Sequence, residues 1–282
     1  MRRSRPFLTK PDLRDREGQL GRLFGPARRS SLASALPARP LALAVVCGLA
    51  FVLTLAIPAR ARPAEPETVA YTTADGFRVV ARYYRPAAPA SFAAVILPDP
   101  AEGKEAWSFL ADTLLALGYH VLVPDLRGTG ESALRRGVRR DRSRFTAAEI
   151  ADAGLDAAAA LHYFRDLPAT SIRGVAWIGS GAGNAALLHA DLGGPERAVR
   201  ILVSPRIEDT EVSPLRSEGP LLVVVENDDL PGIEASASLV PGHTDRRCWL
   251  IEGVGRGAEL LRSRGDWIST LTSWIERSLT SE

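Results

Sequence analysis

The stretch Gly118–Ser132, GYHVLVPDLRGTGES, decides the fold of this 282-residue chain. It contains HVLVP, a short apolar run typical of a buried strand. The following RGTG allows the positive φ angles of a tight turn, whose backbone the side chains of Asp125 and Arg127 can bind. The stretch therefore predicts a buried strand that ends in a tight, hydrogen-bonded turn.

Other short apolar runs alternate with helical patterns on both sides of this stretch. The expected strands are TVAYTT and FRVVARYY, joined as a hairpin through Asp75-Gly76, and then AAVILP, GVAWIG, VRILVS, PLLVVV and CWLIEG. Five helices are expected between and after these strands. The first runs from about Lys104 to Leu117, the second ends near Phe164, the third includes Leu188 and Leu192, a short fourth follows PLLVVV, and the last carries Trp267, Leu271 and Trp274. This alternation predicts one α/β domain over residues 68–282, with a mostly parallel sheet covered by helices on both faces.

The pattern GYxVLxPDxRGxGxS within Gly118–Ser132, together with this order of elements, resembles the α/β-hydrolase family over about residues 68 to 280. The resemblance implies a mostly parallel sheet with an N-terminal hairpin. It also implies a nucleophile, an acid and a histidine base near the carboxyl edge of that sheet. The segment between VRILVSP and PLLVVV is too short for the helical cap that many members carry, so we expect no cap domain.

In that family the nucleophile stands at the centre of G-x-S-x-G, a strained turn from strand to helix. Residues 179–183 read GSGAG, which puts Gly181 at the centre and Ser180 in the preceding, variable position. Centring the motif on Ser180 would put Ile178 at the position of the first glycine of the motif, where backbones pass too closely for a large side chain. It would also remove Ile178 from the apolar strand VAWI. The sequence thus favours Gly181 at the nucleophile position, and Ser180 remains the alternative nucleophile.

The resemblance also assigns the acid and base positions. The turn ENDD after PLLVVV places Asp229 at the acid position, with Asp228 as the near alternative, and VGRGAEL places Arg256 where the base histidine belongs. Arginine stays protonated at physiological pH and cannot accept a proton, so we expect Arg256 to form an ion pair with Asp229. The chain's histidines start or precede strands or lie along helices, so none is expected to replace the base: His120, His162, His189 and His243.

Asp99-Pro100 replaces the family's His-Gly in the loop after AAVILP. The oxyanion donors would be the backbone amides of Ala101 and Ala182, and a carboxylate at Asp99 would oppose a developing oxyanion. Departures at the nucleophile, base and oxyanion positions predict loss of serine-hydrolase activity. We therefore expect a binding or interaction domain. The alternative is a hydrolase that acts on small esters through Ser180.

The first part of the chain differs from the rest. Residues 1–40 carry ten Lys or Arg against three Asp or Glu, and residues 41–57, LALAVVCGLAFVLTLAI, carry no charge. As a helix the apolar segment would be about 26 Å long, close to the thickness of a bilayer core. We expect a basic leader, a single membrane anchor and a linker at 58–67, with the folded domain outside the cytoplasm. The alternative is a signal segment cleaved near Ala61, which leaves a secreted or periplasmic protein.

Composition limits the cofactors and partners. Cys47 and Cys248 form no metal-type spacing, and we expect neither a metal nor another cofactor. The net charge of +2 comes from the leader, so the domain is not expected to bind nucleic acid. Arg256, with the amides at the helix start after Gly181, would suit a small anionic ligand such as a carboxylate or phosphate. A protein partner is the other possibility.

Six arginines follow the turn ESAL within ten residues: Arg135, Arg136, Arg139, Arg140, Arg142 and Arg144. In a domain tethered near a membrane, such a cluster would attract anionic lipid headgroups. A solvated charged loop is the alternative.

Overall fold

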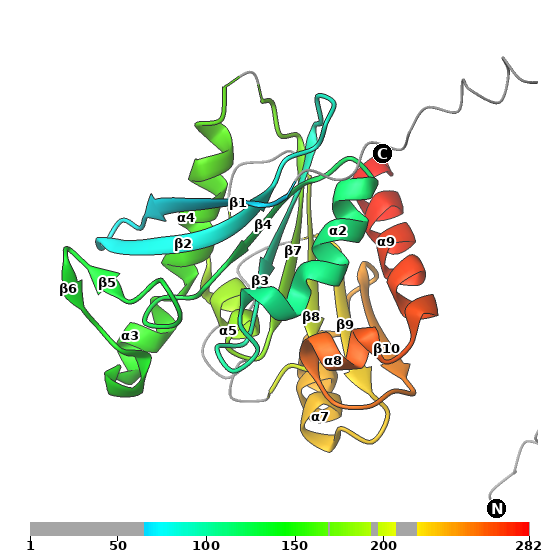
Figure 1. The fold of residues 1–282 in the computed structure, drawn as a ribbon. Coiled ribbons are helices and arrows are strands. Elements are labelled where there is room, and N and C mark those ends of the chain that lie inside the picture. The colour runs from blue at the N-terminus through cyan, green and yellow to red at the C-terminus, as the bar shows by residue number, and fades with distance from the viewer. Residues whose placement is uncertain (1–64, 169, 193–196, 207–218, 282) are drawn as a thin grey trace, which may run out of the picture. The chain divides into compact units, whose positions relative to one another are not determined.

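The computed structural model of the protein describes residues 65–168, 170–192, 197–206 and 219–281, and the structural statements below concern these residues. A ten-stranded sheet forms their centre, in the order β10-β9-β8-β7-β3-β4-β2-β5-β6, with β1 paired to β2 (Figure 1). The strands are β1 (Glu67–Thr72), β2 (Phe77–Tyr84), β3 (Phe92–Leu97), β4 (His120–Pro124), β5 (Leu134–Arg135), β6 (Val138–Arg139), β7 (Gly174–Ser180), β8 (Arg197–Val203), β9 (Leu221–Glu226) and β10 (Arg246–Ile251).

Helices cover both faces of this sheet (Figure 1). The α-helices are α2 (Ser108–Ala116), α3 (Ala147–Ala151), α4 (Gly154–Arg165), α5 (Ala182–His189), α7 (Leu230–Leu239), α8 (Gly257–Arg262) and α9 (Gly265–Thr280), and two 3-10 helices span Lys104–Trp107 and Arg142–Arg144. Strands β3, β4 and β7 to β10 run parallel to one another, whereas β1, β2, β5 and β6 pair antiparallel. The predicted α/β fold, with its N-terminal hairpin and mostly parallel sheet, is confirmed.

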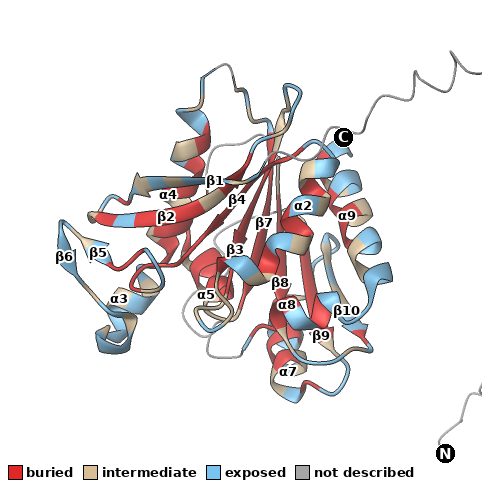
Figure 2. Ribbon diagram, in the orientation of Figure 1, coloured by how far each residue is buried: buried red, intermediate tan, exposed pale blue. Residues whose placement is uncertain are grey.

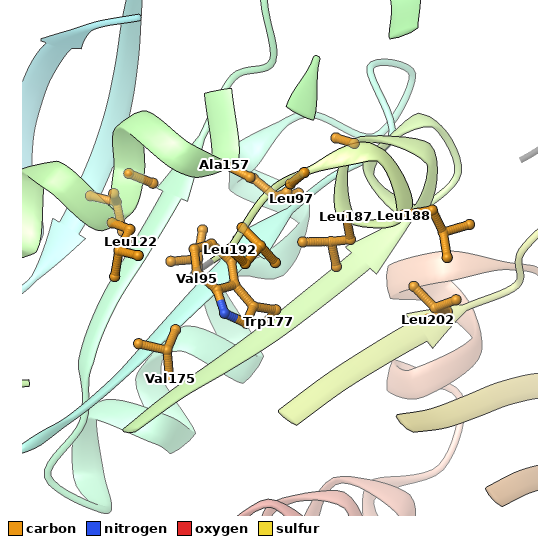
Figure 3. Close-up of a cluster of buried hydrophobic side chains, with 14 of the residues drawn as sticks. Val95, Leu97, Leu122, Ala157, Val175, Trp177, Leu187, Leu188, Leu192 and Leu202 are labelled. Atoms are coloured by element: carbon orange, nitrogen blue, oxygen red, sulfur yellow. The ribbon is translucent and has the colours of Figure 1, made fainter. Parts of the chain in front are cut away.

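Side chains that alternate along the strands form two cores, one on each face of the sheet. Trp177 of β7 and Leu97 of β3 belong to one core. Their neighbours Ile178 and Ile96 point to the opposite face and belong to the other core. Helices α4 and α5 cover the Trp177 side, whereas α2, α8 and α9 cover the Ile178 side. Figure 2 shows the central strands as almost wholly buried, and Figure 3 shows Trp177 among aliphatic side chains.

The stretch Gly118–Ser132 forms β4 and the turn that follows it. The turn needs glycine at 130, where φ is 46° and a Cβ would lie 2.3 Å from Oδ2 of Asp125. That carboxylate accepts hydrogen bonds from the Lys104 side chain at 2.5 Å and from the Glu131 amide at 3.0 Å. Arg127 is only 1% exposed. Its side chain and its amide both bind the buried Asp156 of α4, which fastens the turn to the body of the domain. Asp125 thus binds the backbone of the turn as predicted, whereas the Arg127 side chain binds carboxylates instead.

The prediction that the helix after β7 extends through Leu192 is wrong at the C-terminal end. Helix α5 stops at His189, because Ala190 takes an extended conformation with φ −70° and ψ 135°. A Cβ on Gly154 of α4 would lie 2.9 Å from the Ala190 amide nitrogen, so glycine lets α4 approach the backbone closely where α5 ends. Hydrophobic periodicity continues to Leu192 and therefore does not mark this end of the helix.

The basic leader, the apolar segment 41–57 and residues 58–64 of the linker lie outside the described residues, and Glu67, the last linker residue, already belongs to β1. Within the part of the chain that the structure describes, no helix is both long and apolar enough to cross a membrane.

Candidate functional site

The turn between β7 and α5 carries the position expected for a nucleophile. Ser180 is the last residue of β7, and Gly181 connects the strand to α5 with φ 50° and ψ −122°. A left-handed φ costs a residue with a side chain about 1–2 kcal/mol, whereas glycine adopts it freely. The structure thus places Gly181 at the centre of the turn and Ser180 immediately before it.

Close packing requires small residues on either side of this turn. A Cβ on Gly183 would lie 1.9 Å from the Leu97 carbonyl oxygen, and one on Gly179 would lie 2.9 Å from the Asn184 amide nitrogen. The Asn184 side chain donates a hydrogen bond to the Val203 carbonyl oxygen at 3.0 Å, which ties α5 to β8. These contacts fix the turn at the carboxyl edge of the parallel strands.

The Asp99 carboxylate occupies both expected oxyanion donors. Its Oδ1 accepts a hydrogen bond from the Ala101 amide at 2.8 Å, and its Oδ2 accepts one from the Ala182 amide at 3.1 Å. A Cβ on Gly181 would lie 1.7 Å from the same Oδ2, so Asp99 also fills the space that a nucleophile's side chain needs. A substrate oxyanion would therefore meet a negative charge where a hydrolase offers free amides.

Arg142 brings a positive charge towards this carboxylate. Burial lowers the pKa of Arg142, and the charge of Asp99 acts in the opposite direction. The Arg142 amide donates to the Gly128 carbonyl oxygen at 3.0 Å, which anchors the residue on the turn after β4. Its Nη1 atom is buried and has no hydrogen-bond partner among the described residues. Arg142 thus compensates part of the internal negative charge at the turn.

The acid and base positions form an ion pair. Nη2 of Arg256, before α8, contacts Oδ1 of Asp229, before α7. The Asp229 side chain is 3% exposed and that of Arg256 is 38% exposed. Asp228 is exposed, and its amide donates to the Glu226 side chain at 2.9 Å. Of the two candidate acids, Asp229 is therefore the one paired with the residue at the base position.

A shallow depression of about 470 Å³ surrounds Arg256. Its lining consists of Glu226, Asp228, Asp229, Gly255, Arg256 and Glu259. Four carboxylates thus surround a single guanidinium, which one of them already binds. This charge opposes an incoming anion, and the Ala182 amide, the other part of the expected anion site, donates to Asp99. Anion binding at Arg256 remains a prediction that the local charge does not favour.

Ser180 is buried against the start of α8. It is 2% exposed, and a Cβ on Gly257 would lie 2.4 Å from its Oγ. Beside it, the Glu102 carboxylate accepts hydrogen bonds from the Ala258 amide at 3.0 Å and from the Trp107 indole nitrogen at 2.9 Å. No histidine among the described residues forms a hydrogen bond with Ser180. The alternative nucleophile thus lacks both access and a base.

The histidines lie away from the triad positions, as the sequence predicts. His120 begins β4, where its Nδ1 is 2.6 Å from the Tyr83 hydroxyl oxygen, and burial lowers its pKa. Burial also lowers the pKa of His189, the last residue of α5. His162 is exposed on α4, and His243 is exposed before β10. None provides a general base in the described part of the chain.

Sequence reasoning missed Glu102. This residue joins the loop after β3 to the first turn of α8, although 156 residues separate it from Ala258. No local motif connects two positions so far apart, and an acid in a loop is ordinarily solvated. The sequence does carry a signal for Asp99, because a carboxylate in this loop opposes an oxyanion, but it does not predict that Asp99 binds both amides.

Comparison with known proteins supports the fold. No family model matches the chain, and no curated protein matches its sequence. The solved structure of the Pyrococcus furiosus esterase Pf2001 is similar, with 15% identity, a TM-score of 0.60, and coverage of 76% of this chain and 93% of the esterase. A lidless α/β serine hydrolase from Xanthomonas campestris, XC6422, has 18% identity, a TM-score of 0.60, and coverage of 78% and 98%.

A dienelactone hydrolase from Anabaena variabilis is similar to a comparable degree, with 17% identity, a TM-score of 0.57, and coverage of 76% of this chain and 97% of that one. At such low identity these likenesses establish the arrangement of the backbone and not the chemistry. Together with the sheet order and the turn after β7, they show that the chain has the α/β-hydrolase fold.

Proposed function

We propose that this protein is a non-catalytic α/β-hydrolase-fold protein that acts by binding a ligand or a partner. The observation that carries the proposal is the hydrogen bonding of the Asp99 carboxylate to the amides of both Ala101 and Ala182. A serine hydrolase needs such donors free for its tetrahedral intermediate. The nucleophile position, Gly181, carries no side chain, and the base position, Arg256, holds a permanent cation.

The test is labelling of the full chain with a fluorophosphonate probe, together with hydrolysis of a short-chain aryl ester. We expect no labelling and no turnover above the buffer rate. The informative variant is Asp99→Gly/Gly181→Ser/Arg256→His, which frees both amides and restores a nucleophile and a base. Its matched control, Gly181→Ser/Arg256→His, retains Asp99. Activity in the first variant and not in the second would support the inhibitory role of Asp99.

The competing function is a hydrolase that acts on small esters through Ser180. Labelling of the wild-type chain that disappears in Ser180→Ala would establish it and end the non-catalytic proposal. The burial of Ser180 and the lack of a histidine partner among the described residues argue against that outcome.

We further propose that the folded domain is held outside the cytoplasm by residues 41–57, or is exported and released by cleavage near Ala61. The support is the uncharged segment itself and the arginine-rich residues before it. Mass spectrometry of the chain from the producing cell, with protease treatment of intact cells, separates the two forms. Anchoring predicts a membrane-bound chain that retains residues 41–57, and cleavage predicts a start near residue 62. A full-length chain in the cytoplasm would contradict both.

A further inference from the structure

The arginine cluster spans a β-hairpin at one end of the sheet and the 3-10 helix Arg142–Arg144 that follows it. Strands β5 and β6 extend the sheet beyond β2 and project from the side of the domain (Figure 1). The opposite end of the sheet, at β9 and β10, carries the Asp229–Arg256 pair. Arg136 and Gly137 form the hairpin turn with φ 48° and 82°. Two successive positive φ angles define a tight two-residue connection.

The structure divides the six arginines into two sets of three. Arg135, Arg140 and Arg142 are partly buried. Arg135 binds Asp75 at 3.4 Å and lies over the Phe77 ring, Arg140 contacts Glu149, and Arg142 faces the turn near Asp99. The side chains of Arg135 and Arg140 hold the hairpin to the domain, whereas Arg142 begins the 3-10 helix after it.

The other three arginines, Arg136, Arg139 and Arg144, are exposed. No carboxylate among the described residues lies within ion-pair distance of any of them. Asp141 is the acid that interacts with Arg139 and Arg144, although its pKa is lowered above all by Ser143 and only more weakly by these two arginines. The hairpin and the 3-10 helix after it therefore present three exposed arginines that form no ion pair with a described carboxylate.

An exposed apolar side chain lies among these cations. Val138 is 65% exposed, although valine is ordinarily buried. A hollow of about 670 Å³ is lined by Val138, Arg139, Arg140, Asp141, Ser143 and Arg144. Leu134, on the paired strand, is 37% exposed but stands opposite Arg139, so it lies on the other face of the hairpin from Val138. An apolar tip flanked by arginines suits the boundary between phospholipid headgroups and acyl chains.

We propose that the β5–β6 hairpin docks on an anionic phospholipid surface. Arg136, Arg139 and Arg144 would bind headgroup phosphates, and Val138 would enter the interface. Three solvent-facing arginines around an apolar tip complement such a surface in both charge and polarity. The inference rests on the proposed function in one respect only: the proposed membrane anchor, residues 41–57, would bring the hairpin close to a bilayer. A linker of ten residues, 58–67, spans at most about 36 Å, which keeps a tethered domain close to the bilayer.

The experiment places an environment-sensitive fluorophore on the full chain at Val138→Cys, in a Cys47→Ala/Cys248→Ala background. The matched control carries the same fluorophore at Val254→Cys, because Val254 is 68% exposed and follows β10 at the other end of the sheet. Each protein is mixed with vesicles of phosphatidylcholine, alone or with an equal part of phosphatidylglycerol. Adding the vesicles from outside presents lipid to the hairpin whether or not residues 41–57 insert.

We expect a blue shift at position 138 with phosphatidylglycerol vesicles only. The shift should fall as salt is raised from about 0.1 M to about 1 M, because the screening length drops from about 10 Å to about 3 Å. Position 254 should not shift. Arg136→Gln/Arg139→Gln/Arg144→Gln should abolish the shift, whereas neutralising three exposed arginines elsewhere, Arg173, Arg247 and Arg277, should leave it in place.

Equal shifts at positions 138 and 254 would overturn the proposal, since the chain would then meet lipid without using the hairpin. A shift of unchanged size in the hairpin triple variant would overturn it as well, and so would no shift at position 138 with either vesicle. None of these results bears on catalysis, because the hydrolase test uses other residues and another readout.

Discussion

The Cβ position of Gly181 lies 1.7 Å from the Oδ2 atom of Asp99, far inside the contact distance of two unbonded atoms. The glycine at the nucleophile position and the carboxylate on the oxyanion amides are therefore mutually dependent. No side chain fits at position 181 while Asp99 keeps its hydrogen bonds to Ala101 and Ala182. Two departures from a hydrolase that look independent in the sequence are one coupled feature in the structure.

This coupling is measurable by a double-mutant cycle. Gly181→Ser should lower the free energy of unfolding by about 2–4 kcal/mol, because backbone strain adds to the displacement of Asp99. In an Asp99→Gly background the same substitution should cost about 1–3 kcal/mol less. Urea denaturation of the two single variants and the double variant gives the coupling energy directly.

The control for strain alone is Gly137→Ser. Gly137 has a φ of 82° and no atom within 4 Å of its Cβ position, so its substitution reports the cost of the backbone angle without a clash. In the Asp99→Gly background, the excess cost of Gly181→Ser over Gly137→Ser should shrink. If the cost of Gly181→Ser is the same with and without Asp99, the two residues are not coupled.

The parts of this site that the sequence predicts are local ones. The spacing GSGAG and the end of the apolar run VAWI are enough to place Gly181 in the turn, because strand periodicity and glycine's freedom at positive φ act within a few residues. The expected contact between Arg256 and Asp229 follows from the order of elements in the resembling family. Both residues stand just outside neighbouring parallel strands, so the topology brings them together.

What the sequence does not predict depends on how loops fold back. Asp99 reaches two amides because the amides of Glu102 and Gly103 bond to its own carbonyl oxygen at 2.9 and 3.1 Å, which curls the loop around its carboxylate. The hairpin of β5 and β6 is too short to leave a periodic pattern. The division of the six arginines into anchored and exposed side chains depends on the pairing of β5 with β2 and on the 3-10 helix that follows, neither of which the sequence pattern reveals.

The Asp229–Arg256 pair should contribute to stability, because removing Arg256 leaves a buried carboxylate with no cation. We expect Arg256→Ala to lower the free energy of unfolding by about 1–3 kcal/mol. In an Asp229→Asn background, position 229 carries no negative charge that would be left unpaired. The same Arg256→Ala change should then cost less than about 1 kcal/mol. Arg264→Ala is the control, because the partners of Arg264 among the described residues are the exposed acids Glu252 and Asp266, and its loss should change stability by about 0.5 kcal/mol or less. Equal costs for the two arginines would refute the buried-pair account.

Glu102 should prove structural despite its place at the sheet edge. Glu102→Ala removes the acceptor of both the Ala258 amide and the Trp107 indole nitrogen, and should cost about 1–3 kcal/mol. Thermal unfolding followed by tryptophan fluorescence measures this cost, since Trp107 is fully buried. Glu105→Ala provides the comparison, because the Glu105 side chain is 59% exposed and its ion pair with Arg82 lies at the surface. If Glu102→Ala lowers the stability of the domain no more than Glu105→Ala does, solvent replaces both hydrogen bonds of Glu102 and the structural role is refuted.

His120 should make the domain less stable as the pH falls below neutrality. Burial, helped by the positive charge of Arg85, lowers the pKa of His120 below its ordinary value of 6.5. The unfolded chain therefore binds a proton at a higher pH than the folded domain does. The stability that neutral His120 contributes is complete above pH 6.5 and is lost as the pH falls from there through the lowered pKa. Its hydrogen-bond partner, the Tyr83 hydroxyl, stays neutral throughout this range, because burial raises the pKa of Tyr83 to about 12.

The measurement compares wild type with His120→Gln, whose side chain is neutral at every pH. The difference between their free energies of unfolding should shrink by up to about 1.4 kcal/mol per pH unit as the pH falls from about 6.5 towards about 5. Above about pH 7 the difference should be constant, because His120 is neutral in both the folded and the unfolded chain. A difference that grows as the pH falls would mean that the folded domain stabilises the imidazolium form, and the burial argument for His120 would then be wrong.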